Sequence, residues 1–402
     1  MKGSVTNSVF LRNVRAVLPN HTIAISSLLI EGDRIARIFD STKDLPRADQ
    51  DIDLGGLTVF PGFIDVHIHG AVGVDVMQAS TDDLAQVSEF LATRGVTGWL
   101  PTTVPASAED YQRAIAAING LMHRQTGARL PQARALGVHY EGPFVNQSQC
   151  GALHTDYFAT YSGTAVLNQL PVPEEKSAVR MTTLAPEIDG GIDLIRELAA
   201  RGWVSSIGHT RATVEDLDKA AEAGARHMTH FMNAMTPLHH RSPGPVAWGL
   251  SRDDVTCDIV ADGIHLDPFV LKLLLRVKSA GRLTLISDAI AAAGRGDGSY
   301  DIWGETIQVR NGRTSNARGS IAGSVITMLD AVRMMLSLSA RETDVAKMAA
   351  TNPARLLGLD RDCGSIEEGK RADLVVLDSD GNIEMTVVGG VIVKAVKRRN
   401  KK

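Results

Sequence analysis

The sequence PGFIDVHIHG at residues 61–70 joins a Pro-Gly turn to an apolar run that ends in two histidines, His67 and His69. Alternate side chains of a β-strand point to the same face, so both imidazoles can approach one point. Neutral imidazole is the commonest metal ligand in proteins, and this pair can begin a metal site. A histidine pair alone is a weak signal, because histidines near strand ends are more often hydrogen-bonded structural residues. A metal site is therefore predicted only if other strands of the chain supply further ligands.

Apolar runs and amphipathic helical patterns alternate through the middle of the chain. Further strand-like runs lie at residues 98–103, 135–140, 180–184, 204–207, 227–231, 256–260 and 283–287. Helical patterns separate most of them, and residues 80–83 and 213–216 have the capping pattern that opens a helix. With the opening run, about eight strands alternate with helices, which predicts an α/β fold, a (β/α)8 TIM-like barrel. A doubly wound open sheet is the alternative, but no GxGxxG sequence follows a strand.

Both ends of the chain differ from this middle. Residues 8–60 and 372–390 read as short strands joined by turns, without helical periodicity. We therefore expect a small β-sandwich domain built from both termini, at residues 1–60 and 356–402, around a barrel at residues 61–355. The glycine-rich residues 294–323 interrupt the last barrel unit, and we expect a hairpin there with a loop facing the active site.

Composition sets the class of protein. A chain of 402 residues, 44% hydrophobic and 22% charged, is typical of a soluble globular protein with one large domain and a smaller one. The net charge of −4 favours neither nucleic acid nor an anionic membrane as a partner. No apolar run reaches the about 18–20 residues of a membrane span, and a signal-peptide layout is absent. Three widely spaced cysteines fit reduced thiols, so we expect a cytoplasmic location.

Metal-ligand and acid–base side chains recur where the predicted strands end. Functional residues of such barrels lie at the C-terminal ends of the strands. The candidates there are His67, His69, Glu141, His209, His230, His265 and Asp288. Singly, each histidine is more often a structural residue and each aspartate more often a helix cap. Their recurrence at six strand ends predicts a metal-dependent hydrolase.

The chemistry of such a hydrolase requires this mixture of side chains. Imidazoles and a carboxylate suit Zn²⁺ or a similar divalent ion, and Glu141 can bridge two ions if the His67–His69 pair is also filled. A bound metal lowers the pKa of its water to about 7 and polarises a scissile carbonyl. Asp288, just outside the ligand set, can take the proton of the water and deliver it to the leaving nitrogen.

Further motifs extend along the chain. They are HYEGPFVN (139–146), TLAPE (183–187), GHT (208–210), THFMNAM (229–235), RSPG (241–244), ADGIH (261–265), SDA (287–289), IAGSVITM (321–328) and GSIEEGKRADLVVLD (364–378). Together with residues 61–70, these motifs resemble the amidohydrolase superfamily and, within it, the group that deacetylates N-acetylglucosamine 6-phosphate. The resemblance covers essentially the whole chain.

The resemblance implies hydrolysis of the acetamide of N-acetylglucosamine 6-phosphate to glucosamine 6-phosphate and acetate. It implies metal ligation by Glu141, His209 and His230, with Asp288 as general base and acid. The expected cofactor is a divalent ion, Zn²⁺ first, with Fe²⁺, Mn²⁺ or Co²⁺ as alternatives. Some members lack the HxH pair and use one metal; this chain has both histidines, so one or two ions per subunit are expected.

The resemblance also implies contacts with a phosphorylated N-acetyl-amino-sugar from Asn233, from the backbone of Ala234 and from His265. Arg241 aligns with an arginine that reaches the phosphate bound by a neighbouring subunit, which implies a homodimer. A guanidinium suits this task because its fork can donate two hydrogen bonds to a phosphate.

One segment departs from the family pattern. The family has a Gly-small-His segment after EGPF, whose histidine polarises the acetyl carbonyl. This chain reads CGALH at residues 150–154, which places His154 one residue later than usual. We expect His154 to take the role through an adjusted loop; the alternative is a surface histidine.

Two other functions stay open. The same fold can deacetylate N-acetylgalactosamine 6-phosphate or another N-acyl compound, which a substrate panel with and without phosphate would separate. The chain can also be a catalytically dead scaffold, although such proteins usually lose ligands and this chain has all of them. An empty site after metal-replete expression would favour the scaffold.

Overall fold

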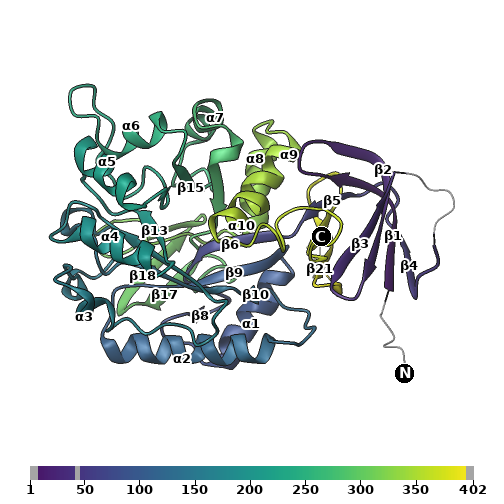
Figure 1. Ribbon diagram of the computed structural model, residues 1–402, viewed down its shortest axis with the longest axis horizontal. Coiled ribbons are helices and arrows are strands. Elements are labelled where there is room, and N and C mark those ends of the chain that lie inside the picture. Colours follow the sequence, from purple (N-terminus) through teal and green to yellow (C-terminus); the bar gives the residue numbers. More distant parts are fainter. Residues whose placement is uncertain (1–7, 41–45, 395–402) are drawn as a thin grey trace.

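Eight parallel strands form a nearly closed barrel in this computed structural model, which describes residues 8–40 and 46–394 (Figure 1). In order around the barrel they are β6 (Phe63–Ile68), β9 (Val96–Thr103), β11 (Gly137–Glu141), β12 (Val179–Leu184), β13 (Val204–Ile207), β14 (His227–Met228), β15 (Thr256–Val260) and β16 (Leu283–Ile286). The short β10 (Arg134–Ala135) extends the pairing along β9. The predicted (β/α)8 fold is confirmed.

The barrel closes where the first and last strands meet, at the ends that carry the candidate site residues. The backbone N–H of Asp288, just after β16, donates to the carbonyl of His67 in β6 at 2.9 Å. Below this contact, the buried carboxylate of Asp65 accepts a hydrogen bond from the Ser287 hydroxyl at 2.5 Å. Segments more than two hundred residues apart in the sequence are thereby held side by side.

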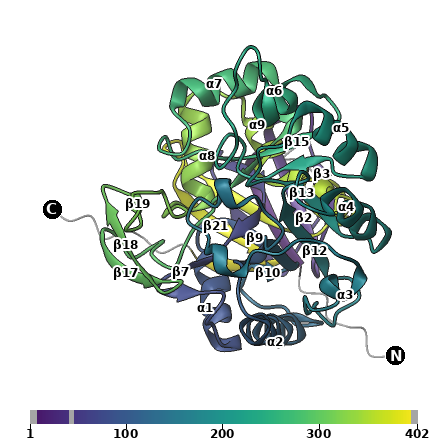
Figure 2. The ribbon, with the colours of Figure 1, turned by 90° about the vertical axis from the view of Figure 1, so that its left-hand side faces the viewer.

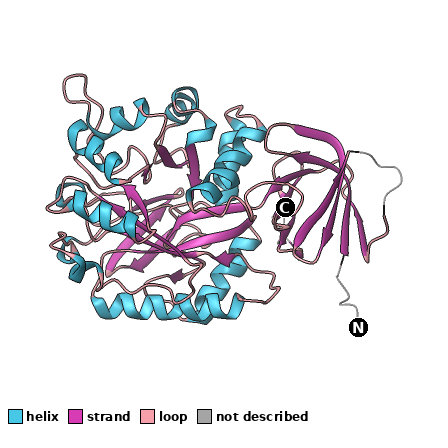
Figure 3. Ribbon diagram, in the orientation of Figure 1, coloured by secondary structure: helices cyan, strands magenta, loops and turns pink. Residues whose placement is uncertain are grey.

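Helices cover the outside of the barrel (Figure 3). They are α1 (Thr81–Ala92), α2 (Ala108–Gln125), α3 (Thr164–Leu167), α4 (Gly191–Ala200), α5 (Val214–Ala223), α6 (Gly244–Ser251), α7 (Pro268–Val277), α8 (Met328–Ser337), α9 (Glu342–Ala346) and α10 (Asn352–Leu356). The predicted capping boxes are present at the start of α1, between Ser80 and Asp83, and of α5, between Thr213 and Asp216. None of the helices in the described part of the chain combines the length and the apolar character needed to cross a membrane.

Strands from both ends of the chain share a second sheet, seen in Figure 1 as purple and yellow strands beside the barrel. They are β1 (Ser8–Val17), β2 (Thr22–Glu31), β3 (Arg34–Phe39), β4 (Gln50–Asp53), β5 (Thr58–Pro61), β20 (Leu374–Leu377), β21 (Ile383–Val388) and β22 (Val391–Lys394). The sheet runs in the order β22-β21-β20-β5-β1-β2-β3, with β4 also paired to β1, and has its own apolar core. The exact boundaries between the two domains stay a prediction.

The glycine-rich segment after β16 forms a separate small sheet, which Figure 2 shows at the edge of the barrel. Its strands are β17 (Gly298–Ile302), β18 (Glu305–Arg310) and β19 (Arg313–Ser315), all antiparallel. The expected hairpin is therefore present and has a third strand. Two very short strands, β7 (Gly70–Ala71) and β8 (Val74–Asp75), pair with each other after β6.

The three cysteines predict a simple pattern of thiol reactivity. Burial raises the pKa of the Cys257 thiol to about 12 and that of the Cys363 thiol to about 11, whereas Cys150 is half-buried. Thiolate is the reactive form, so a disulfide reagent at about pH 8 should label one thiol per folded chain and the other two only after unfolding. The Cys150→Ser variant should lose the fast phase; rapid labelling of that folded variant would contradict the assignment.

Candidate metal centre

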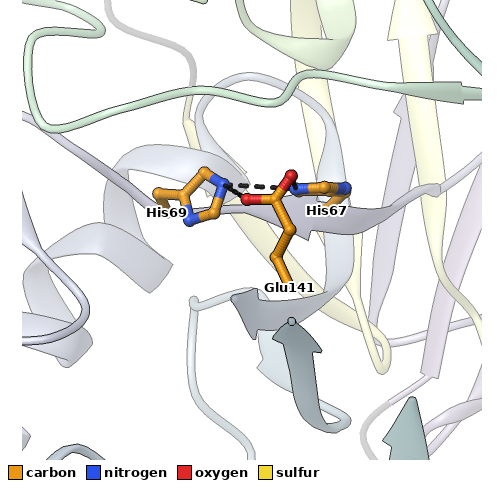
Figure 4. A group of neighbouring side chains, drawn as sticks. All are labelled: His67, His69 and Glu141. Atoms are coloured by element: carbon orange, nitrogen blue, oxygen red, sulfur yellow. Dashed lines mark hydrogen bonds and ion pairs between the residues drawn. The ribbon is translucent and has the colours of Figure 1, made fainter. Parts of the chain in front are cut away.

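Four histidines and one glutamate meet at the C-terminal mouth of the barrel, and all five are buried. His67 lies in β6 and His69 directly follows that strand. Glu141 is the last residue of β11, and His209 and His230 follow β13 and β14. They form two groups whose possible ligand atoms all lie within 4.8 Å of one another, and Glu141 belongs to both. Figure 4 shows the first group, with the Glu141 carboxylate between the two imidazoles of β6.

The distances place the Glu141 carboxylate among four imidazole nitrogens. Its Oε1 atom lies 3.0 Å from Nε2 of both His209 and His230, and 3.6 Å from Nε2 of His67. Its Oε2 atom lies 3.3 Å from Nε2 of His69. The imidazoles also face each other within each pair, with Nε2–Nε2 distances of 3.2 Å for His67–His69 and 3.1 Å for His209–His230. Two nitrogens at such a separation require a proton or a cation between them.

In His69 and His209, the ring nitrogen that faces away from Glu141 has its own hydrogen-bond partner, which sets the position of the ring proton. Nδ1 of His69 lies 3.2 Å from the carbonyl oxygen of Thr102, and Nδ1 of His209 lies 2.7 Å from that of Gln149. A carbonyl oxygen can only accept, so both Nδ1 atoms are donors. In a neutral ring this leaves the Nε2 lone pair free and directed at the Glu141 carboxylate, which is the arrangement of a metal-binding histidine. The donor set therefore fits a divalent ion.

Burial and charge act in opposite directions on the two carboxylates. When the surrounding imidazoles are protonated, burial raises the pKa of Glu141, but the charge of His67 and the hydrogen bonds from the imidazoles outweigh it and hold this pKa well below its usual range. Asp288 lies with Oδ1 3.5 Å from Nε2 of His67 and 3.4 Å from Nε2 of His69. Burial also raises its pKa, while the charge of His67 and the hydrogen bond with His69 lower it overall. Both groups are therefore carboxylates at neutral pH.

The backbone turns sharply at several of these residues. The φ angles of His209, His230 and Asp288 are 46°, 27° and 49°, and those of Met232 and Ala234 are also positive. Residues other than glycine rarely adopt a positive φ, and each residue held there lowers the stability of the fold by about 1–3 kcal/mol. The predicted strand at residues 227–231 is therefore wrong after residue 228: β14 ends there, and the following turns direct His230 into the site.

A buried histidine that the sequence reasoning missed supports the site from below. The ring of His139 lies 4.6 Å from that of His67, its Nδ1 atom donates to the carbonyl of Val66 at 3.0 Å, and its Nε2 atom accepts from the Thr183 hydroxyl at 2.8 Å. Burial and the charge of His67 hold the pKa of His139 well below its usual range, so the ring is neutral. The available signal was its position two residues before Glu141, on the same strand face.

A cavity of about 330 Å³ opens above the cluster. Three predicted substrate residues, Asn233, Ala234 and His265, line it together with Asp288. The Nδ1 atom of His265 is held at 2.6 Å from the Asp262 carboxylate.

Two predicted residues do not belong to the lining. His154 directly follows Leu153, which lines the cavity, but His154 itself does not line it. Arg241 is exposed, and its Nη1 atom lies 2.8 Å from Nε2 of His240. The roles given to His154 and Arg241 stay predictions.

Other lining residues were not predicted, and Trp303 is the largest of them. Its indole meets the ring of His69 edge to face, with a centroid distance of 5.1 Å and an angle of 79° between the planes. No sequence rule separates such a tryptophan from a core tryptophan; its place in the glycine-rich segment was the only hint.

The chain is similar to known proteins over most of its length. The model of the amidohydrolase family matches residues 58–393. The chain belongs to this family. It is 33% identical over 389 residues to N-acetylglucosamine-6-phosphate deacetylase of Bacillus subtilis, which covers 96% of this chain and 98% of that protein.

Two further similarities bear on the substrate. The chain is 37% identical over 331 residues to N-acetylgalactosamine-6-phosphate deacetylase of Escherichia coli O157:H7, which covers 82% of this chain and 86% of that protein. It superposes with a TM-score of 0.85 and 29% identity on N-acetyl-D-glucosamine-6-phosphate deacetylase of Mycobacterium smegmatis, solved as a mutant in complex with N-acetyl-D-glucosamine-6-phosphate. That match covers 97% of this chain and 99% of the other.

The cluster predicts which histidines hold metal. His209→Gln and His230→Gln each remove a nitrogen donor that faces Glu141, so the bound metal per chain should fall at least about tenfold after dialysis, measured by elemental mass spectrometry. The exposed His240→Gln variant is the matched control and should retain the metal of the unmodified protein. Full metal content in both cluster variants would show that the ion lies elsewhere.

Proposed function

We propose that this protein hydrolyses the acetamide of N-acetylglucosamine 6-phosphate to glucosamine 6-phosphate and acetate. The observation that carries the proposal is the position of Asp288, a carboxylate within 3.5 Å of Nε2 of both His67 and His69 and in the lining of the cavity. This is where a proton acceptor for an attacking water is needed. The relatives named for this reaction support the choice of substrate.

Glu141, His209 and His230 would hold a divalent ion, Zn²⁺ first, with Fe²⁺, Mn²⁺ or Co²⁺ as alternatives. His67 and His69, with the shared Glu141, offer a second position, so one or two ions per subunit are proposed. Imidazole nitrogens with a carboxylate oxygen are the donor set that Zn²⁺ prefers. When bound, such an ion supplies Lewis acidity, which polarises an amide carbonyl and lowers the pKa of water.

The side chains of the protein divide the remaining work. Asp288 accepts the proton of the attacking water and then donates it to the leaving nitrogen, because an amine leaves poorly as an anion. The sugar phosphate is held by three other residues of the cavity lining: Asn233, the backbone of Ala234, and His265. His154 donates to the acetyl oxygen as charge develops on it.

Arg241 reaches the phosphate bound by a partner subunit in a homodimer. Support for a homodimer comes from an exposed apolar stripe on α7. It consists of Phe269, Leu273 and Val277, which are four residues apart and lie on one face of the helix. These three residues are 75%, 41% and 48% exposed, in that order. Repeated apolar exposure on one helix face is typical of a protein interface.

A cytoplasmic location is proposed from the cysteines. All three are free thiols in the structure, and disulfides are rare in the reducing cytosol.

The second candidate substrate is N-acetylgalactosamine 6-phosphate. The relative from Escherichia coli that is named for this substrate has the higher identity, 37%, over a shorter match. The two sugars differ in the orientation of one hydroxyl group. Turnover of both phosphates, and of both sugars without phosphate, separates these candidates.

The proposed reaction is tested by acetate release from N-acetylglucosamine 6-phosphate. Asp288→Asn removes the proton acceptor but keeps the shape of the side chain, so kcat should fall by about 10²–10⁴ while the metal content is retained. The exposed Asp156→Asn variant, on the loop beside the cavity, should keep normal turnover. Metal-loaded protein that releases no acetate from this substrate would refute the substrate assignment. Normal turnover by Asp288→Asn would refute the role of Asp288.

The homodimer is tested by sedimentation velocity. Phe269→Lys with Leu273→Lys places two charges on the α7 stripe, so the double variant should sediment as a monomer where the unmodified chain is a dimer. Ile25→Lys, which changes an exposed apolar residue of β2 in the sheet of the two termini, should leave the dimer intact. A dimer that survives the double variant would place the interface elsewhere.

A further inference from the structure

Trp303 occupies a turn position that tryptophan rarely adopts. It forms the two-residue turn between β17 and β18 with Gly304, flanked by the paired residues Ile302 and Glu305. The φ angles of Trp303 and Gly304 are 54° and 76°, as a type I′ turn requires. Asn-Gly is the usual sequence for such a turn, and a bulky side chain is strained at its first position. A strained residue beside a functional site points to a function for its side chain.

The indole of Trp303 does not extend into solvent but lines the cavity and packs edge to face on His69. Burial raises the pKa of the nearby Asp75 carboxyl group, in β8, to about 6, and the Trp303 side chain acts in the opposite direction. The indole therefore contacts His69 and lies near Asp75 of β8, and it also lines the cavity.

The lining of the cavity contains both apolar and polar side chains. Its larger apolar residues, which we call the apolar wall, are Ala152, Leu153, Trp303 and Ile321. Trp303 lies next to His69, which follows β6, the first barrel strand. Asn233 and His265, two polar residues of the lining, follow β14 and β15, the sixth and seventh strands around the barrel.

We propose that Trp303 is a specificity-determining residue that limits the acyl group of the substrate to acetyl. The inference rests on the proposed deacetylation. An amide that places its carbonyl carbon at Asp288 and its sugar at Asn233 and His265 directs its acyl chain away from the sugar, toward the apolar wall. The indole closes this wall, so each additional methylene of the acyl chain meets the ring.

The wall is held in place by contacts between two loops. Nη2 of Arg318, after β19, donates to the carbonyl of Ala152 at 3.3 Å and pairs with Glu305 of β18 at 3.8 Å. Trp303 and Ala152 also pack on one apolar cluster formed around β17 and β18. These contacts join the small sheet to the loop at residues 150–153 and therefore oppose displacement of the indole by a longer acyl chain.

The test compares kcat/KM for N-acetyl-, N-propionyl- and N-butyrylglucosamine 6-phosphate. One methylene in an apolar pocket changes selectivity by about 10–200-fold, so the unmodified protein should prefer acetyl over propionyl by at least about tenfold. Trp303→Ala should reduce that preference to within about threefold, and Trp303→Phe, which keeps an aromatic ring, should give an intermediate value. Tyr300→Ala, which truncates an aromatic residue of β17 outside the cavity lining, should keep the original preference.

Each outcome decides a separate point. Equal losses on all three substrates in Trp303→Ala, with reduced metal content, would mean that Trp303 only positions His69, and would overturn the inference. An unchanged acetyl preference in both Trp303 variants would overturn it as well. If the unmodified, metal-loaded protein cleaves none of the three compounds, the proposed deacetylation is wrong. The role proposed for Trp303 in acyl selection is then wrong as well.

Discussion

The site depends on the closure of the barrel between β6 and β16. The hydrogen bond from Asp288 N–H to the carbonyl of His67 joins the two strands beside the cluster of candidate metal ligands, and the buried Asp65–Ser287 pair joins them again nearby. An open sheet with the same strands would leave Asp288 far from the imidazoles of β6. Because closure sets the separation of Asp288, the proposed proton acceptor, from two candidate ligands, it determines the geometry of the proposed site as well as the fold.

The interior of this barrel is unusually polar beneath the cluster. The hydroxyl groups of Thr183, Thr229 and Ser206 form a chain with spacings of 2.7 Å and 2.5 Å, and Thr183 also donates to His139. Barrels of this type more often fill the interior with branched apolar side chains. A fully bonded polar network fixes ring orientation better than apolar packing, since every partner has a required direction. The strained φ angles at the strand ends are tolerated on such a rigid base.

Much of the fold was predictable because its signals are local. Capping boxes such as Ser80–Asp83, apolar runs and turns depend on neighbouring residues, and they indicated the barrel and the strand-rich termini. Convergence of the strand-end side chains followed from the rule that parallel strands of a barrel end at one face. His67, His69 and Glu141 could therefore be placed together from sequence alone.

What could not be predicted depends on contacts distant in sequence. The early end of β14 is set by turns with positive φ at His230, which no residue propensity encodes. The position of His154 relative to the cavity depends on how its loop packs against the small sheet. Trp303 reads as a core residue until the hairpin that holds it is placed over the barrel mouth.

The shared sheet of the two termini has a consequence for synthesis of the chain. β5 leads directly into β6, and in the sheet it lies between β1 and β20. All barrel strands leave the ribosome before β20, so β5 keeps one unpaired edge while the barrel is being made. An open edge is a template for pairing with other chains, and the nascent protein carries that hazard until its last strands emerge. A chain truncated before residue 374 would keep the edge open permanently.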